Sequence, residues 1–367
     1  MKWLNIIIRY AVGLLFIISG LIKVNDPVGT AIKLDEYFEV FAADISPIFI
    51  SLIPAALFLS VFLSVLEVAL GVALLVRFKP KLTTALLLII IVFFTFLTFY
   101  SAYFNKVTDC GCFGDALKLS PWQSFSKDII LLVLIVFLFI HERRPAEQYR
   151  KSPATSKPGY IVAAITVLCL FAAWFAINHL PFKDFRAYAV GTNIPVAMQP
   201  SGKFEYAYIM EKDGKQYELD AYPAESEGYK FVEMKTLNPE VGPKITDFNL
   251  WNDEGDYTEE VLSGTKLLVL IQKTEGIDAK AIDNIKELLP NLNAEIEPVI
   301  IASESGETLQ QFLSYSNLNL PFAYADATLV KTIIRSNPGL MLLVNGEVRG
   351  KWHYNDVPEI EELRNLL

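Results

Sequence analysis

Cysteine and histidine are scarce in this chain of 367 residues, which contains three of each. Three cysteines are too few for a scaffold held together by disulfides. Charge is also sparse, because 20% of the residues are charged against about 25% in an average soluble domain. No basic stripe is present, which disfavours nucleic acid as a partner. An aromatic content of 13% argues against a disordered chain, since these side chains bury surface on folding.

The residues that are present divide the chain into two unlike halves. Residues 1–180 have 15 basic and 11 acidic side chains, a balance of +4, and contain the long apolar runs. Residues 181–367 have 17 basic and 30 acidic side chains, a balance of −13. We therefore expect a membrane half followed by an acidic half that lies in water.

Five apolar runs are long enough to cross a bilayer, which takes about 20 mostly apolar residues. They lie near residues 3–24, 52–76, 82–104, 122–140 and 159–180. The first run is interrupted by Arg9 and is followed by no cleavage site of small residues, so we expect an uncleaved helix. The amphipathic stretch 36–50 predicts either an interfacial helix on the outer leaflet or a loop packed on the bundle.

Basic residues gather in alternate loops between these runs. They open the first run, fill the loop at 77–81 and recur in the loop 142–158. Positive loops face the cytoplasm. The pattern predicts a bacterial inner-membrane protein with five spans, a cytoplasmic N-terminus and a periplasmic C-terminal domain. Its expected partners are membrane lipid and a periplasmic or membrane protein.

The sharpest local motif is DCGCFGD, from Asp109 to Asp115, between the third and fourth runs. It falls on the side predicted to be oxidising, where disulfides persist. A disulfide between Cys110 and Cys112 would close a small, strained ring, and strain makes a disulfide a stronger oxidant. The pair is therefore a candidate redox site. The alternatives are a reduced structural turn and a metal site, for which two thiolates without a histidine are a poor ligand set. Cys169, inside the fifth run, is expected to be a packing residue.

Ionisable residues also fall within or beside the apolar runs. Glu67 lies inside the second run, where a charge costs a few kcal/mol, so it should be neutral or paired. The candidate partners of Glu67 are Lys23, Lys127, Thr95 and Thr98. Lys23 and Lys127 are expected near the outer surface of the membrane, which favours Thr95 or Thr98 as the partner of a neutral Glu67. Lys23 and Asp128 are expected at a similar depth, so they are a candidate pair across the first and fourth runs. These groups either support a function or hold the helices together.

The acidic half begins with a β-rich linker, residues 181–240, in which Asp213-Gly214 predicts a hairpin turn. Residues 241–367 then alternate between strand and helix and end in a hairpin around Asn345-Gly346 and a last helix. The expected strands are 266–272, 298–302, 340–344 and 347–352, and the expected helices are 278–289, 306–315 and 358–367. Such an order predicts a mixed sheet covered by helices.

The order of these elements resembles that of a thioredoxin-like domain. In that family a cis-proline faces the active site, and Pro338 occupies the matching place. Active members have a Cys-x-x-Cys motif after the first strand, where a thiol of lowered pKa attacks disulfides. Here that position reads QKTEG, residues 272–276, and residues 181–367 contain no cysteine. The resemblance thus implies a non-catalytic domain that docks a partner.

The first four apolar runs resemble the DoxX-like family and its MauE-type relatives. The matching motifs are Ser19 to Lys23 (SGLIK), Asp26-Pro27 and KLDEYF at 33–38, followed by Glu67, the Cys110–Asp115 loop, and Trp122 with Lys127-Asp128. The resemblance covers residues 1–141 and implies a four-helix membrane domain. For MauE-type members it also implies disulfide handling during the maturation of periplasmic proteins.

The expected fold is a multi-domain membrane protein. It has an all-α four-helix transmembrane bundle (1–141), a cytoplasmic basic loop (142–158), a fifth transmembrane helix (159–180), the β-rich linker (181–240) and an α/β thioredoxin-like domain (241–367). The expected function is periplasmic thiol–disulfide handling or envelope protein maturation through Cys110 and Cys112. The polar residues expected to support this pair are Lys23, Glu67, Asp109, Asp115, Lys127 and Asp128.

Two other functions compete with this hypothesis. One is a non-catalytic scaffold or accessory subunit of an envelope secretion or assembly complex. The other, a small-solute transporter, is weakened because the chain has no internal repeat. No cofactor or metal is assigned with certainty. A quinone is a candidate electron acceptor, and the aromatic residues of the third run (Phe93, Phe94, Phe96, Phe99, Tyr100 and Tyr103) are its candidate site.

Overall fold

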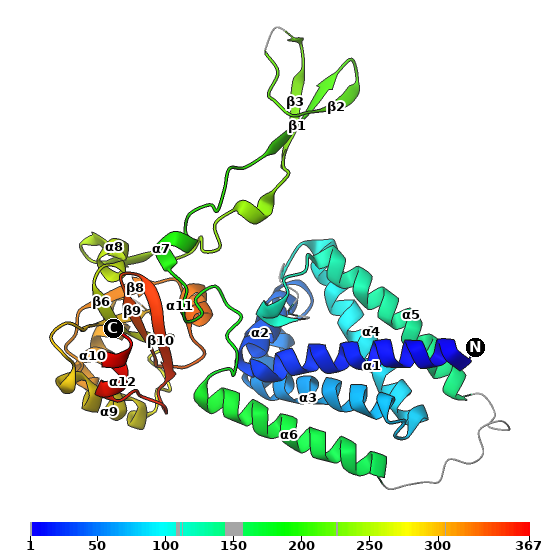
Figure 1. Ribbon diagram of the computed structural model, residues 1–367, viewed down its shortest axis with the longest axis horizontal. Coiled ribbons are helices and arrows are strands. Elements are labelled where there is room, and N and C mark those ends of the chain that lie inside the picture. Colours follow the sequence, from blue (N-terminus) through cyan, green and yellow to red (C-terminus); the bar gives the residue numbers. More distant parts are fainter. Residues whose placement is uncertain (1, 108–110, 112, 144–156, 225–226, 305) are drawn as a thin grey trace. The chain divides into compact units, whose positions relative to one another are not determined.

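The computed structural model describes residues 2–107, 111, 113–143, 157–224, 227–304 and 306–367 (Figure 1). The chain divides into two compact units, Met1–Arg186 and Ala187–Leu367. The first is helical. The second contains two β-sheets, one of seven strands with helices and one of three strands. The expected combination of a membrane bundle with an α/β unit is confirmed.

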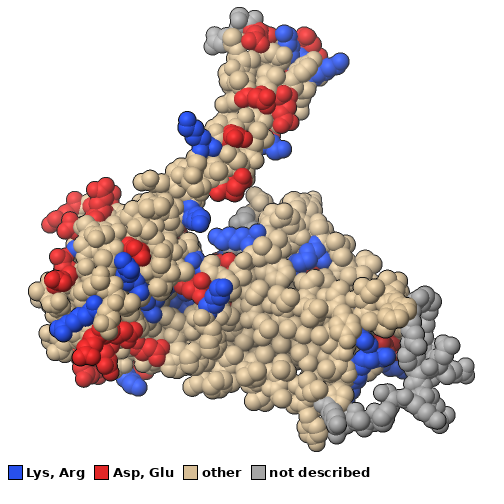
Figure 2. Space-filling model, viewed as in Figure 1, with Lys and Arg blue, Asp and Glu red and all other residues tan. Residues whose placement is uncertain are grey.

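Among the described residues, five helices are long and apolar enough to cross a membrane. They are α1 (Lys2–Asn25), α3 (Ala56–Leu75) with the 3-10 turn η1 (Pro47–Ala55) before it, α4 (Pro80–Phe104), α5 (Pro121–Arg143) and α6 (Lys157–His179). All five match the predicted runs within a few residues. Figure 2 shows that the middle of these helices, on the visible side, is almost free of charged side chains. Such a surface suits the hydrocarbon core of a bilayer.

A further helix, α2 (Pro27–Asp44), follows α1 directly. It begins earlier than the amphipathic pattern indicated, because Asp26 caps it by accepting a hydrogen bond from the Gly29 N–H (2.8 Å) and Pro27 occupies its first position. Its apolar side packs on the start of α3. The stretch 36–50 is thus the end of a packed helix and the start of η1, rather than a loop.

The end of α2 is tied to the end of α4 by an ion pair. Lys106 Nζ donates to both carboxylate oxygens of Asp44, at 2.6 and 2.5 Å, and the Tyr100 hydroxyl also donates to this carboxylate. The hydrogen bond from Lys106 is the main reason that the pKa of Asp44 lies below its usual value. These contacts hold α2 beside the bundle at the end where α4 leads into the Asp109–Asp115 loop.

The closest helix contact in the membrane unit is between α1 and α3, and it depends on glycines. A Cβ atom at Gly71 would lie 2.7 Å from the Gly13 carbonyl oxygen, and one at Gly20 would lie 2.9 Å from the Ser64 carbonyl oxygen. Neither distance is tolerated between these atoms. Small residues at such positions let transmembrane helices approach closely, as in other membrane bundles. The glycines therefore set the register in which α1 lies against α3.

Replacing Gly71 with alanine should force α1 away from α3. We expect Gly71→Ala to lower the melting temperature of the purified protein in detergent by several degrees, because the added methyl group meets backbone rather than a flexible side chain. Gly202→Ala is the control, since its Cβ would make only ordinary contacts, at 3.5 Å or more. Equal melting temperatures for the two variants would show that Gly71 does not set this contact.

The second unit is built around a mixed seven-stranded sheet in the order β10-β9-β6-β7-β8-β4-β5. The strands are β4 (Leu250–Asn252), β5 (Gly255–Asp256), β6 (Thr265–Ile271), β7 (Glu297–Ala302), β8 (Phe322–Ala325), β9 (Gly339–Val344) and β10 (Glu347–His353). Strands β6, β7 and β8 are parallel, and β9 and β10 form the antiparallel hairpin. Strand β6 is apolar and buried almost throughout because it lies inside the sheet.

The helices of this unit are short. They are α7 (Ile194–Ala197), α8 (Thr258–Leu262), α9 (Ala279–Leu288), α10 (Glu307–Ser316), α11 (Ala327–Ile333) and α12 (Ile360–Asn365). The predicted strands and helices from residue 266 onward are confirmed, and the Asn337–Pro338 peptide bond is cis as expected. The β8 strand and the α11 helix were not predicted, because four and seven residues are too few to show a clear period.

The three-stranded antiparallel sheet lies between residues 206 and 236 and has the order β2-β1-β3. It consists of β1 (Tyr206–Lys212), β2 (Lys215–Leu219) and β3 (Lys230–Thr236). The hairpin predicted around Asp213-Gly214 is confirmed as β1 and β2. Both turn residues have positive φ, which Asp and Gly tolerate better than most residues.

Candidate functional site

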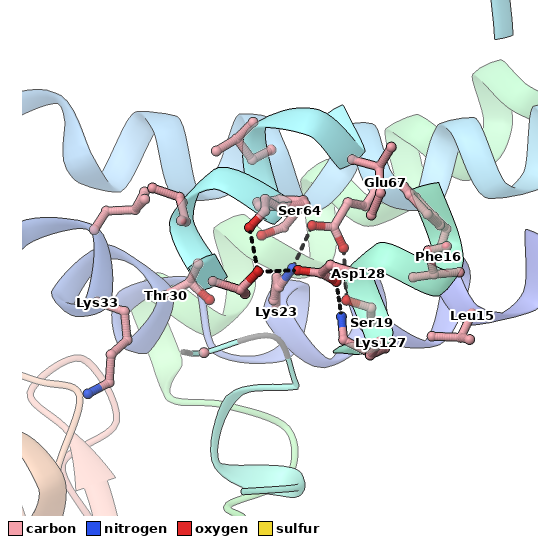
Figure 3. Close-up of a pocket in the computed structure, with 18 of the residues that line it drawn as sticks. Leu15, Phe16, Ser19, Lys23, Thr30, Lys33, Ser64, Glu67, Lys127 and Asp128 are labelled. Atoms are coloured by element: carbon pink, nitrogen blue, oxygen red, sulfur yellow. Dashed lines mark hydrogen bonds and ion pairs between the residues drawn. The ribbon is translucent and has the colours of Figure 1, made fainter. Parts of the chain in front are cut away.

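A pocket with about 790 Å³ of empty space, part of it open to solvent at its mouth, lies within the membrane unit (Figure 3). Helices α1 to α5 all contribute to its wall, and so does Gly111 of the loop between α4 and α5. The wall is mainly apolar, with Leu, Ile and Phe side chains. Its polar groups come from Ser19, Lys23, Thr30, Lys33, Tyr37, Ser64, Glu67, Thr98, Lys127 and Asp128. Four of the polar residues expected from the sequence, Lys23, Glu67, Lys127 and Asp128, are thus brought together.

One side of the pocket is an ion pair between α1 and α3. Lys23 Nζ lies 2.5 Å from Glu67 Oε1, and the Ser19 hydroxyl donates to the other carboxylate oxygen at 3.0 Å. Glu67 is 2% exposed and Lys23 is 7% exposed. The ammonium also lies 4.6 Å from the centre of the Phe94 ring. A carboxylate with a cation and a hydroxyl at its two oxygens is held in one orientation, as Figure 3 shows.

The partner predicted for Glu67 was wrong. The prediction favoured a threonine of the third span, because Lys23 is close to the end of its helix. In the structure, Gly20 brings α1 onto α3 at Ser64 and Glu67, and Lys23, about one turn further along α1, reaches the Glu67 carboxylate. The long lysine stem then covers the remaining distance, as amphipathic side chains do in membranes. Thr95 instead donates to the Ile91 carbonyl of its own helix.

The other side of the pocket is a polar group on α4 and α5. Asp128, 1% exposed, accepts hydrogen bonds from the Thr98 hydroxyl (2.9 Å) and from Lys127 Nζ (2.6 Å). The predicted pair between Lys23 and Asp128 was therefore also wrong, because each residue has a nearer partner. Two buried carboxylates, each with its own cation, face one pocket from opposite helices.

The loop with the two cysteines reaches this pocket at Gly111. Asp109, Cys110 and Cys112 lie outside the described residues, but Gly111 and Phe113, on either side of Cys112 in the sequence, are described. A Cβ atom at Gly111 would contact the Lys33 stem at 3.4 Å.

Phe113 lies near a second lysine, with Lys127 Nζ 5.5 Å from the centre of its ring. Asp115 belongs to the following 3-10 turn, η2 (Gly114–Ala116). Two lysines of the pocket, Lys33 and Lys127, thus contact the described residues that flank Cys112.

Sequence reasoning missed Ser19 and Lys33 as pocket residues. Both stand in the short motifs that carried the family resemblance, so the signal was present. Their roles, however, depend on which helix faces which. Lys33 forms an ion pair with Glu36, one turn along α2, at 3.1 Å. This pair orients the lysine head while its stem lies against the loop.

The remaining sequence candidates do not join this site. Of the six aromatic residues of α4 named as quinone-site candidates, Phe94 alone lines the pocket. Phe93, Phe96, Phe99 and Tyr103 are exposed on the helix surface and do not form one quinone-sized site with it. Cys169 is buried against α3 residues, as expected of a packing residue. Among the described residues, which do not include the two loop cysteines, no cluster of metal-ligand side chains occurs.

In the second unit, the position after β6 forms a hydrogen-bonded turn. The Gln272 N–H donates to Asn337 Oδ1 (2.9 Å), and the Asn337 amide donates to the Lys273 carbonyl (2.7 Å). The Thr274 N–H and hydroxyl both donate to Glu304. The turn after β6 and the cis-Pro338 loop therefore face each other through amide and carbonyl groups, and no thiol is present there.

Comparisons with known proteins agree with this arrangement for the membrane part. Residues 1–141 match the family described as methylamine utilisation protein MauE, so the first four spans form a MauE-family membrane domain. Residues 204–237 match a domain of unknown function (DUF8463). A stretch of 143 residues is 32% identical to "Protein TlpB" of Flavobacterium psychrophilum. That match covers 38% of this chain and 37% of TlpB. No solved structure matches the chain.

Removing one partner of the Lys23–Glu67 pair should leave a buried charge without compensation. We expect Lys23→Met to destabilise the membrane unit by about 3–5 kcal/mol, and the double variant Lys23→Met, Glu67→Leu to recover most of that loss. Thermal unfolding in detergent measures both. If the double variant loses as much unfolding free energy as Lys23→Met and Glu67→Leu lose together, the two side chains do not act as a pair.

Proposed function

We propose that this chain is a DoxX-like component of the bacterial inner membrane that takes part in thiol–disulfide exchange during the maturation of envelope proteins. Cys110 and Cys112 are the proposed redox pair. The proposed orientation places the N-terminus in the cytoplasm, and the cysteine loop and residues 181–367 in the periplasm. The basic loops predicted from the sequence support this orientation.

The observation that carries the proposal is the position of Gly111 in the wall of the pocket. This residue separates the two cysteines in the sequence, and it lines a pocket that also contains the buried Lys23–Glu67 pair and the partly buried Lys127–Asp128 pair. Polar groups inside a membrane are costly, and they usually face a cavity that has a function. A dithiol loop at the mouth of such a pocket joins the two unusual features of the membrane unit in one site. The MauE-family match of residues 1–141 supports the same function.

The proposed reaction is exchange with a client protein. A client thiolate attacks one sulfur of the Cys110–Cys112 disulfide and forms a mixed disulfide. The second client thiolate then releases the reduced pair. The client gains a disulfide, while Cys110 and Cys112 gain the two protons and two electrons. Reoxidation needs an electron acceptor, for which a quinone or a partner thiol protein is proposed.

The lysines beside the loop suit this chemistry. A thiolate, rather than a thiol, is the attacking and leaving group, and a nearby cation favours it. Lys33 contacts Gly111, and Lys127 lies near Phe113. Both are therefore proposed to favour the thiolate form of the pair, in addition to the structural bonds that they make.

Residues 241–367 of the second unit are proposed to form a thioredoxin-like domain that has no dithiol of its own and docks a partner. Three features support this proposal: the parallel pair β6 and β7, the antiparallel hairpin β9 and β10, and the cis-proline loop that faces the turn after β6. Since residues 181–367 contain no cysteine, this unit performs no disulfide exchange alone.

A second candidate function is a non-catalytic scaffold. The same ion pairs favour it in one respect, because buried polar groups also hold membrane helices together. In that case the cysteine loop is a structural turn and the acidic unit anchors an envelope complex. The two functions differ in whether Cys110 and Cys112 change oxidation state.

Thiol trapping in intact cells distinguishes them. In a Cys169→Ala background, cells are quenched with acid and alkylated with a maleimide–polyethylene glycol before and after reduction. We expect a mixture of oxidised and reduced pairs that shifts with added reductant, and we expect Cys110→Ser and Cys112→Ser each to abolish function while membrane insertion is unchanged. Thiols that stay reduced, or two serine variants with normal function, would instead favour the scaffold.

Lys33 gives a second test of the same site. We expect Lys33→Met to raise the apparent pKa of the reactive loop thiol and to slow its alkylation at neutral pH, since a pKa higher by about one leaves a tenth of the thiolate. Lys33→Arg should restore the rate, and Lys118→Met, an exposed lysine farther along the same loop, is the control. Identical pH profiles of alkylation for Lys33→Met and the wild type would show that Lys33 does not act on the thiols.

A further inference from the structure

The three-stranded sheet β2-β1-β3 has one apolar face. In its register Tyr208 lies opposite Leu219 and Met234, and Met210 lies opposite Tyr217 and Phe231. Directly opposite residues point to the same side of a sheet, and so do residues two apart on one strand. These six side chains, which we call the aromatic face, are Tyr208, Met210, Tyr217, Leu219, Phe231 and Met234. A register shift in β3 puts Phe231 and Met234 on the same side although they are three residues apart. Lys212 and Lys215 lie on this side at the turn end, and Lys212 Nζ is 4.9 Å from the centre of the Tyr229 ring.

The opposite face is mainly polar. Ile209 lies there between Glu218 and Glu233, and Ala207 lies opposite Lys235. A sheet with one apolar and one charged face ordinarily covers a core with its apolar side. The sequence of this sheet is therefore that of a half-buried layer.

The aromatic face is nevertheless exposed along the two edge strands β2 and β3. Tyr217, Phe231 and Met234 are 42%, 53% and 48% exposed, and Met210 alone is buried beneath its neighbours. Two further tyrosines extend the apolar surface, Tyr222 beside Tyr208 and Tyr229 beside Tyr217. Among the described residues, no helix of the second unit packs extensively on these strands. An exposed apolar surface of this kind marks an interaction site.

We propose that the aromatic face binds an extended polypeptide segment in which apolar and basic residues alternate. The apolar side chains of such a segment would lie on the face, since alternate residues of an extended chain point to one side. If the segment pairs with an edge of the sheet, its basic side chains point to the opposite side, where Glu218 of β2 and Glu233 of β3 lie. Residues 204–237 as a whole contain eight acidic and four basic side chains, a balance of −4. This inference does not depend on redox activity of the cysteine loop.

The size of the face argues against a second copy of this chain. Three strands about 4.8 Å apart and five residue pairs long, at about 3.3 Å per residue, give a face of roughly 240 Å². A stable dimer buries about 800 Å² on each partner. An extended segment needs less area on the face, because its backbone can also form hydrogen bonds with an edge strand of the sheet. Both β2 and β3 are edge strands, with no strand beyond them among the described residues.

The charge argues against a bilayer as the occupant. Aromatic side chains do lie at membrane interfaces, but bacterial lipid surfaces are largely anionic, and a module with a balance of −4 is repelled by them. The same balance attracts a basic segment and predicts that binding weakens as salt is added. An unfolded or partly folded basic client has the required chemistry.

The test uses the full chain in nanodiscs of neutral lipid. The probe is a fluorescent, cysteine-free decapeptide of alternating valine and lysine, and its anisotropy reports binding. A decapeptide with glutamate in place of lysine and empty nanodiscs are the controls. We expect binding of the basic probe, at least tenfold weaker binding of the acidic probe, and loss of affinity with added salt.

Variants assign the binding to the aromatic face. We expect Phe231→Ser with Tyr217→Ser to weaken binding at least tenfold, and Tyr315→Ser, which removes an 89% exposed tyrosine from α10, to leave it unchanged. Because the serine variant could unfold the sheet, Met234→Lys and Met234→Glu form a second pair. Both remove the same apolar group, but the lysine should repel the probe and the glutamate should not.

Several outcomes would overturn the proposal. They are no binding of the basic probe, equal binding by wild type and serine variant, and equal binding by the two Met234 variants. Flotation with anionic vesicles that depends on Phe231 would make a bilayer the occupant. Dimerisation that the serine variant abolishes would make a second copy the occupant. If the peptide binds as expected while the loop cysteines never change oxidation state, the proposed redox function fails and this inference stands.

Discussion

The close approach of α1 to α3 is the contact on which the membrane unit depends. Gly13, Gly20 and Gly71 have no side chains to keep the two backbones apart, and the helices meet where even a methyl group would not fit. This approach sets the register between the helices. The register then decides that Lys23 and Ser19 reach the two oxygens of Glu67. A wider separation would leave a carboxylate unpaired inside the membrane, at a cost of several kcal/mol.

The polar groups of the bundle are arranged around a space rather than packed against one another. Two carboxylates, each with a lysine and a hydroxyl, face the pocket from different helices. Apolar side chains of similar volume would hold the helices together at no greater cost, since buried ion pairs contribute little net stability. Their position in one pocket with Gly111, which separates the two cysteines in the sequence, is the physical reason to connect them with the redox chemistry proposed for that loop.

The acidic unit contributes contact surfaces rather than thiols. Its seven-stranded sheet has a hydrogen-bonded turn after β6, which faces the cis-Pro338 loop and contains no thiol. Its three-stranded sheet exposes an aromatic face that ordinary packing would cover. The proposals for the two units thus divide the work, with exchange at the membrane loop and recognition of the client in the acidic unit.

The sequence by itself determined the elements with a strong period or an uninterrupted apolar run. These were the five spans, strands such as β6, and the Asp213-Gly214 hairpin, because their signals are local. Tertiary structure decided the partners of Glu67 and Asp128, the place of Lys33 beside Gly111, and the exposed face of β1 to β3. Each depends on which surfaces meet. Depth along a helix could not reveal that Gly20 brings Lys23 within reach of Glu67, because the contact needs the absence of a side chain on one helix and the position of a carboxylate on another.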